Sequence, residues 1–212
     1  MKQQCWYQVA PLAIALILVS AVPGETQAWR EQMILKFSEP VLVPGATLPP
    51  GSYEFRLLDS DANRHIVRIA TEDGSNVLAT THLVPLKRLD VKGDIVLKFN
   101  PTDAGTPPAL KAWFYPGTVY GHEFIYPEAQ AKLIAERTKT IVLSTDVPGS
   151  DLSKGTLRTF QPSGAVAEWK ADPVTMREWG DWEKKRRATA PMVASGFKET
   201  RVKLDDLETN PS

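Results

Sequence analysis

The chain has 212 residues, a formal net charge of zero at neutral pH and 42% hydrophobic residues. This charge balance creates no strong field for nucleic acid or anionic lipid, and we expect no nucleic-acid partner. Its 17 prolines favour strands, turns and extended linkers over a helical bundle.

The N-terminal segment has the pattern of a secretory signal peptide. An apolar run over residues 9–22 is followed by the helix breaker Pro23 and then by small residues. The run is shorter than the roughly 20 apolar residues of a membrane-spanning helix, so a retained anchor is the weaker alternative. We predict that residues 1–28 are removed by cleavage before Trp29, and that the mature chain is periplasmic or secreted. The only cysteine, Cys5, lies ahead of the run, so the mature chain would form no disulfide.

Short strand patterns with turn signals at their ends fill residues 29–145. In residues 52–58, Tyr53, Phe55 and Leu57 alternate with polar residues, as in a half-buried strand. Further strands are expected over residues 32–43, 65–70, 77–84, 86–91, 94–99, 109–115 and 140–145. This spacing predicts a mainly β domain, an antiparallel β-sandwich or barrel. One helix is expected to pack on it, over residues 127–138.

The character of the chain changes after residue 145. Residues 146–212 are predicted to form a partly ordered C-terminal extension. A hairpin is expected over residues 156–169, followed by a helix over residues 173–188 that carries Trp179 and Trp182 one turn apart. The polar end of the chain is predicted to be disordered.

Several pieces of the body resemble one group of proteins. They are residues 37–41, Val43-Pro44-Gly45, residues 48–55, Arg64-His65-Ile66-Val67 and residues 112–127. Over residues 29–144 the chain resembles uncharacterised exported bacterial proteins that are usually labelled hypothetical. The resemblance implies an exported β-rich domain and no particular chemistry.

The most aromatic stretch, residues 112–127, is the strongest candidate for a binding surface. Strand alternation predicts Lys111, Trp113 and Tyr115 on one face, with Leu110, Ala112 and Phe114 on the other. Exposed aromatic rings can stack on sugars or anchor a protein partner. The candidate binding residues are Trp113, Tyr115, Tyr120, Tyr126 and Lys111. The alternative is that the helix over residues 127–138 covers this face and buries the rings.

The sequence holds no convincing metal or cofactor motif. Its three histidines, His65, His82 and His122, fall on separate predicted strands, whereas a zinc site needs three or four converging ligands. Neighbouring Glu123 should point to the strand face opposite His122. We therefore expect no metal, no cofactor and no assigned catalytic residue.

A calcium loop is also disfavoured. Asp59, Asp61 and Asn63 have the alternate spacing of its first ligands. The glycine and the acid that such a loop needs at its sixth and twelfth positions are replaced by Arg64 and Ala70. A polar turn explains this segment better.

Three functions remain open from the sequence. We favour an exported, non-catalytic binding module of the cell envelope that engages a polysaccharide or a protein through the aromatic strand face. The rival is a secreted hydrolase-like enzyme with a site around His82, His122 and Glu123. The third is a structural envelope protein whose extension does the binding. Trp179 and Trp182 lie beside the basic run at residues 184–187, a combination that can bind a membrane surface. The acidic residues of the same helix disfavour membrane contact.

Overall fold

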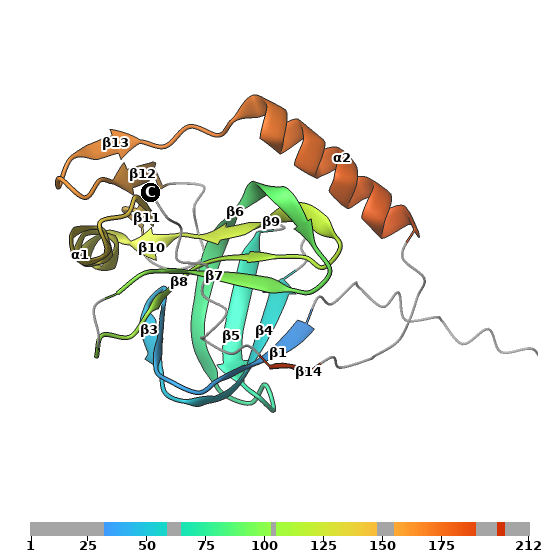
Figure 1. Cartoon of the computed structure of the whole chain (residues 1–212), viewed down its shortest axis with the longest axis horizontal. Coiled ribbons are helices and arrows are strands. Elements are labelled where there is room, and N and C mark those ends of the chain that lie inside the picture. The colour runs from blue at the N-terminus through green and yellow to red at the C-terminus, as the bar shows by residue number, and fades with distance from the viewer. Residues whose placement is uncertain (1–31, 59–64, 103–104, 148–154, 190–198, 202–212) are drawn as a thin grey trace, which may run out of the picture.

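A computed structural model describes residues 32–58, 65–102, 105–147, 155–189 and 199–201 (Figure 1). The described chain is mainly β with two helices and more than one sheet, so the predicted mainly β class is confirmed. The elements are β1 (Gln32–Phe37), β2 (Val41–Val43), β3 (Ala46–Leu48), β4 (Gly51–Leu58), β5 (Ile66–Thr71), β6 (Val77–Lys92), β7 (Val96–Asn100), β8 (Ala109–Phe114), β9 (Thr118–Phe124), β10 (Tyr126–Pro127), α1 (Glu128–Thr138), β11 (Val142–Thr145), β12 (Leu157–Phe160), β13 (Val166–Glu168), α2 (Pro173–Thr189) and β14 (Glu199–Arg201).

The main sheet has ten strands and is bent at β6. Its order is β14-β1-β4-β5-β6-β9-β8-β2-β3, with β7 pairing to the side of β8. The first half of β6 pairs with β5 up to His82, and the second half pairs with β9 from Leu83 onward. Figure 1 shows β7, β8 and β9 crossing the direction of β4 and β5. Neither sheet closes into a barrel, so the barrel alternative is wrong, and the sandwich stays a prediction.

The second sheet joins the predicted extension to the body. Its order is β10-β11-β12-β13. The hairpin predicted over residues 156–169 forms as β12 and β13, and β12 pairs with β11 from Val142↔Phe160 to Thr145↔Leu157. The boundary predicted after residue 145 therefore falls between two strands that pair with each other.

Three of the described strand pairs are parallel, although an antiparallel fold was predicted. They are β1 with β14, β2 with β8, and β10 with β11. The other described pairs are antiparallel. Each parallel pair joins strands that are not connected by a tight hairpin, which is the geometric condition for a parallel pair.

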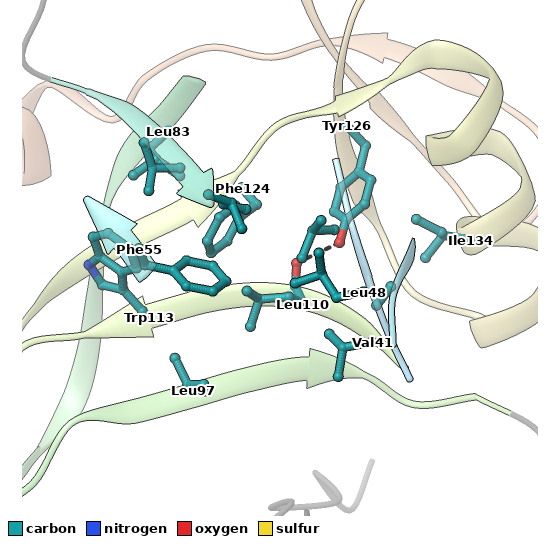
Figure 2. Packing of buried hydrophobic residues seen from close by; sticks show 14 of the residues in the cluster. Val41, Leu48, Phe55, Leu83, Leu97, Leu110, Trp113, Phe124, Tyr126 and Ile134 are labelled. Atoms are coloured by element: carbon teal, nitrogen blue, oxygen red, sulfur yellow. Dashed lines mark hydrogen bonds between the residues drawn. The ribbon is translucent and has the colours of Figure 1, made fainter. Parts of the chain in front are cut away.

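The main core lies against the inner, concave side of the bent sheet. It includes buried side chains from β1, β4, β5, β6 and β8 together with residues of α1 and β11. Figure 2 shows Phe55, Leu83, Trp113 and Phe124 packed close together. Burial of a side chain of this size contributes about 1.5–3 kcal/mol.

Pro85 lies inside β6, which runs unbroken through the two strands predicted over residues 77–84 and 86–91. It pairs opposite His122 of β9. Pairing with β5 has already ended at Ile66↔His82. Among the described strands, none pairs with the β5 side of β6 at Pro85, so the missing N–H interrupts no described ladder there.

The predicted helices form with small shifts of their ends. Pro127 is the N-cap of α1 rather than its first residue. The helix ends at Lys139, whose backbone is left-handed with φ 56° and whose N–H donates to the Ala135 carbonyl at 3.1 Å. The second helix, α2, extends to Thr189, one residue beyond the predicted end.

Some predictions concern residues outside the described part of the chain. They are the signal peptide over residues 1–28, the polar turn over residues 59–63 and most of the C-terminal end. Among the described helices, none combines the length and apolar character needed to cross a membrane.

Candidate functional site: an aromatic and histidine face beneath α2

A β-bulge in β8 changes which side chains share a face. Lys98 of β7 pairs with Ala112, but the next residue, Phe99, pairs with Leu110. Lys111 is therefore an extra residue in β8. A bulge of this kind shifts the alternation of side chains by one position. Lys111 therefore does not share a face with Trp113 and Tyr115, and this part of the predicted grouping is wrong, whereas Trp113 and Tyr115 both contact His122.

The bulge turns Trp113 into the core. Its side chain is 1% exposed and belongs to the main core together with Leu110. Phe114 lies on the opposite face, where the Arg88 guanidinium and the Lys98 ammonium sit 4.9 and 5.8 Å from its ring centre. Trp113 therefore presents no open surface.

Lys111 and Tyr126 also lie away from any aromatic surface. The positive charge of Lys111 interacts with the carboxyl group of Glu123 in β9. Burial raises the pKa of the Glu123 carboxyl, and the nearby Lys111 charge partly offsets this rise. Tyr126 is buried in the core, where its hydroxyl donates to the Leu110 carbonyl at 2.7 Å (Figure 2). That environment raises the pKa of the Tyr126 phenol well above its ordinary value by desolvation.

Four ring side chains form what we call the aromatic face. They are His65, immediately before β5, Tyr115, immediately after β8, and Tyr120 and His122 of β9. Nδ1 of His65 lies 3.4 Å from Nε2 of His122, and the Tyr115 hydroxyl lies 3.4 Å from Nδ1 of His122. His122 is fully buried, whereas the other three are partly exposed.

Helix α2 covers this face with its two tryptophans. The Trp179 ring lies 5.0 Å from His65 and 5.2 Å from His122, measured between ring centres. The Trp182 ring lies 5.3 Å from Tyr115 and 5.1 Å from Tyr120. Aromatic pairs at these separations contribute about 0.5–1.5 kcal/mol each beyond their burial.

The covered side of α2 is a narrow stripe. Trp179 and Glu183 are buried, and Thr175, Met176 and Trp182 are partly buried. These positions follow the three- and four-residue spacing of one helix face. The helix predicted to cover the aromatic strand was α1, so the covering element is a different one.

Polar contacts fix the position and the start of α2. The Lys87 ammonium of β6 pairs with the Glu178 carboxylate at 2.5 Å, and this hydrogen bond raises the pKa of Lys87. Asp172 caps the helix by accepting hydrogen bonds from the Thr175 hydroxyl at 2.6 Å and from the Thr175 N–H at 2.9 Å. These bonds lower the pKa of Asp172.

Two indole N–H groups of this region are buried without a hydrogen bond among the described residues. They belong to Trp113 and Trp179, whose rings both contact His122. In Figure 2 the Trp113 nitrogen points away from Leu110 and Tyr126. A buried donor without an acceptor costs about 1–3 kcal/mol, so the contact between α2 and the face is well packed but not fully satisfied.

No known family model, curated protein or solved structure matches this chain.

The three residues of the hydrolase hypothesis, His82, His122 and Glu123, do not come together in one site. His122 and Glu123 are consecutive in β9 and point to opposite faces. His82 pairs with Ile66, three positions along β6 from the residue opposite His122, and lines a separate cleft of about 150 Å³ with Thr81 and Thr145. A second cleft of about 220 Å³ lies between the start of β8 and α1.

Metal binding has no site among the described side chains, which contain no group of three or more His, Cys, Asp or Glu residues placed to hold an ion. His65 and His122 do meet, although their strands appeared unrelated in the sequence. The signal that could have found the site is the stripe of Trp179, Trp182 and Glu183, which requires a partner surface.

Proposed function

We propose that this chain is an exported, non-catalytic binding module of the cell envelope that recognises a polypeptide helix through its aromatic face. One observation carries this proposal. The face already holds an amphipathic helix, α2, by two tryptophans set one turn apart. Docking an amphipathic helix through anchors at this spacing is a recurring mode of peptide recognition.

The chemistry of the face favours a helix over a flat sugar. Its rings meet Trp179 and Trp182 at interplanar angles from 34° to 67°, so they surround inserted side chains rather than form one flat platform. Trp113 and Tyr126, two of the rings expected to stack on a sugar, lie in the core. The remaining rings are suited to inserted tryptophans, which are common anchors at protein interfaces.

Binding of a labelled peptide with the sequence of residues 171–189 tests the proposal. The full chain would carry Trp179→Ala and Trp182→Ala, so that its own helix no longer competes, and binding would be followed by fluorescence anisotropy. We expect this variant to bind the peptide, and the unchanged chain to bind it much more weakly.

A peptide with alanine at both tryptophan positions is the matched control. Since tryptophan anchors contribute about 2 kcal/mol or more, it should bind at least about tenfold more weakly. The proposal fails if the double variant keeps its β circular dichroism and binds neither peptide. Binding of an envelope polysaccharide by that variant, with no peptide binding, would support the sugar alternative.

A further inference from the structure

The segment after β13 contacts the body at two separate places. Helix α2 lies on the aromatic face, and β14 pairs in parallel with the edge strand β1. The β14 pairing covers three positions, from Ile34↔Glu199 to Lys36↔Arg201. We call α2 and β14 together the C-terminal arm. A docked helix and an added edge strand are both modes by which proteins bind separate peptides.

The arm is joined to the body through a short connection. The Trp169 N–H donates to the Leu157 carbonyl at 2.9 Å, and the first helical bond of α2 runs from Met176 to Asp172. Only residues 170–172 lie between Trp169 and Pro173, the first residue of α2. Rotation within this connection would carry the arm away without breaking a strand pair of the second sheet.

Several of the described contacts that hold the arm are of kinds that contribute little to stability. Among the described contacts are one stripe of α2, a salt bridge whose two side chains are 40% and 37% exposed, and three paired positions in a parallel ladder. Exposed ion pairs contribute little, and parallel pairing is slightly weaker per residue than antiparallel pairing. The buried Nε1 of Trp179 has no acceptor among the described residues, which lowers the cost of releasing the helix.

We propose that the aromatic face and the β1 edge receive the arm of a second copy of this chain, so that two copies exchange arms and form a symmetric dimer. Each copy carries the arm and the surface that fits it, so the exchanged dimer repeats every contact of two closed monomers. Exchange of an identical element is a low-cost route to dimers, and lengthening the hinge connection is a way to suppress it. This inference rests on the proposed helix-binding function.

Cross-linking between single-cysteine chains tests the exchange. Full chains carrying Cys5→Ser have no other cysteine. One would also carry Lys87→Cys and the other Glu178→Cys, the two residues of the salt bridge between body and helix. After equal mixing over a range of concentrations, a short bis-maleimide linker is added and covalent dimers are separated on a denaturing gel.

We expect a concentration-dependent covalent dimer, several-fold above that from mixing Lys87→Cys with Lys184→Cys chains. Lys184 lies on the exposed side of α2 and is the matched control. Inserting a flexible Gly-Ser segment after Lys170 should reduce the dimer, because a longer connection favours closure within one chain.

One further chain separates the two proposals. A chain with both Lys87→Cys and Glu178→Cys should cross-link whether the arm is exchanged or not. If it cross-links only within itself and the mixture gives no dimer above the control, arm exchange is overturned while helix docking stands. If neither the double variant nor the mixture cross-links, helix docking and the proposed function are overturned together.

Discussion

Nδ1 of His65 lies 3.4 Å from Nε2 of His122, although 57 residues separate the two in the chain. On its other side, Nδ1 of His122 faces the Tyr115 hydroxyl at the same distance. Both separations are long for hydrogen bonds. They lie beneath Trp179, where little water can compete. The buried imidazole of His122 thus links three segments of the chain.

The first prediction concerns this link. His122→Phe keeps a ring of similar size but removes both nitrogens, leaving His65 and Tyr115 with one polar contact fewer each. We expect the free energy of unfolding in urea to fall by about 1–3 kcal/mol. Tyr115→Phe, which removes only the hydroxyl, should cost about 0.5–1.5 kcal/mol.

The double variant measures the coupling between these two residues. Its cost should be less than the sum of the single costs, because both changes remove the same contact. Costs that add to within about 0.3–0.5 kcal/mol would mean that His122 and Tyr115 are energetically independent.

The second prediction concerns the close approach of β8 and β9 at Gly121. A Cβ on Gly121 would collide with the Trp113 carbonyl oxygen and would lie 2.7 Å from the Phe114 ring and 2.9 Å from the Phe114 Cα. Because two of these three atoms are backbone, the strands would have to separate. Gly121→Ala should lower the free energy of unfolding by about 1–3 kcal/mol or more.

Gly93 supplies the matched control, since a Cβ there meets nothing within 4 Å. Gly93→Ala should change the stability by less than about 0.5 kcal/mol, as is usual for exposed positions. Equal stabilities of the two alanine variants would contradict the close packing of β8 against β9.

The third prediction concerns the cap of α2. Asp172→Ala removes the acceptor of the Thr175 hydrogen bonds and should loosen the helix start. Trypsin cleavage after Lys184 or Lys185 should become several-fold faster, while the β circular dichroism is unchanged. Asp181→Ala, an exposed change on the same helix, should leave the rate unaltered.

The same cap makes docking sensitive to acid. The pKa of Asp172 is lowered in the folded chain, so its stabilising effect is full above its ordinary value of 3.8 and is lost as the pH falls through the lowered pKa. The tryptic difference between Asp172→Ala and the unchanged chain should therefore be present at neutral pH. A pepsin digest below the lowered pKa should show no such difference.

The fourth prediction concerns Glu123. Its folded pKa is raised by burial, so the folded chain holds a proton more tightly than the unfolded chain. Stability should therefore decline as the pH rises from the ordinary value of 4.5 through the raised pKa. Glu123→Gln should raise the melting temperature at neutral pH and leave it nearly unchanged below pH 4. A lower melting temperature for the variant at neutral pH would contradict the burial of this carboxylate.

Much of the fold could be predicted from local patterns. The alternation of Tyr53, Phe55 and Leu57 marks β4, and all three are buried. The helix over residues 127–138 and the hairpin over residues 156–169 could also be predicted, because periodicity and turn chemistry are local properties. Pro85 was expected to separate two strands. A proline is accepted inside β6 because β5 no longer pairs with β6 at this position, and the sequence does not show where that pairing ends.

The site was harder to predict because two long-range facts create it. The residues around Lys111 carry no sequence pattern that predicts a bulge. The bulge nevertheless determines that the side chain of Trp113 faces the core. The meeting of His65, His122 and Trp179 depends on the bend of the sheet at β6 and on where α2 docks. The sequence predicted a helix with Trp179 and Trp182 one turn apart, but not that it would dock on the aromatic strands.

The parallel pairing of β2 with β8, at Leu42↔Ala109, has a consequence for how quickly this chain can fold. The edge of β2 that pairs with β8 can be satisfied only after the chain beyond residue 109 has folded back against β2. Closing a loop of this length must precede any gain from the contact, and folds dominated by such contacts reach the native state in milliseconds to seconds. We therefore expect a folding time in that range, with Leu42→Ala speeding unfolding more than it slows folding if the pairing forms late.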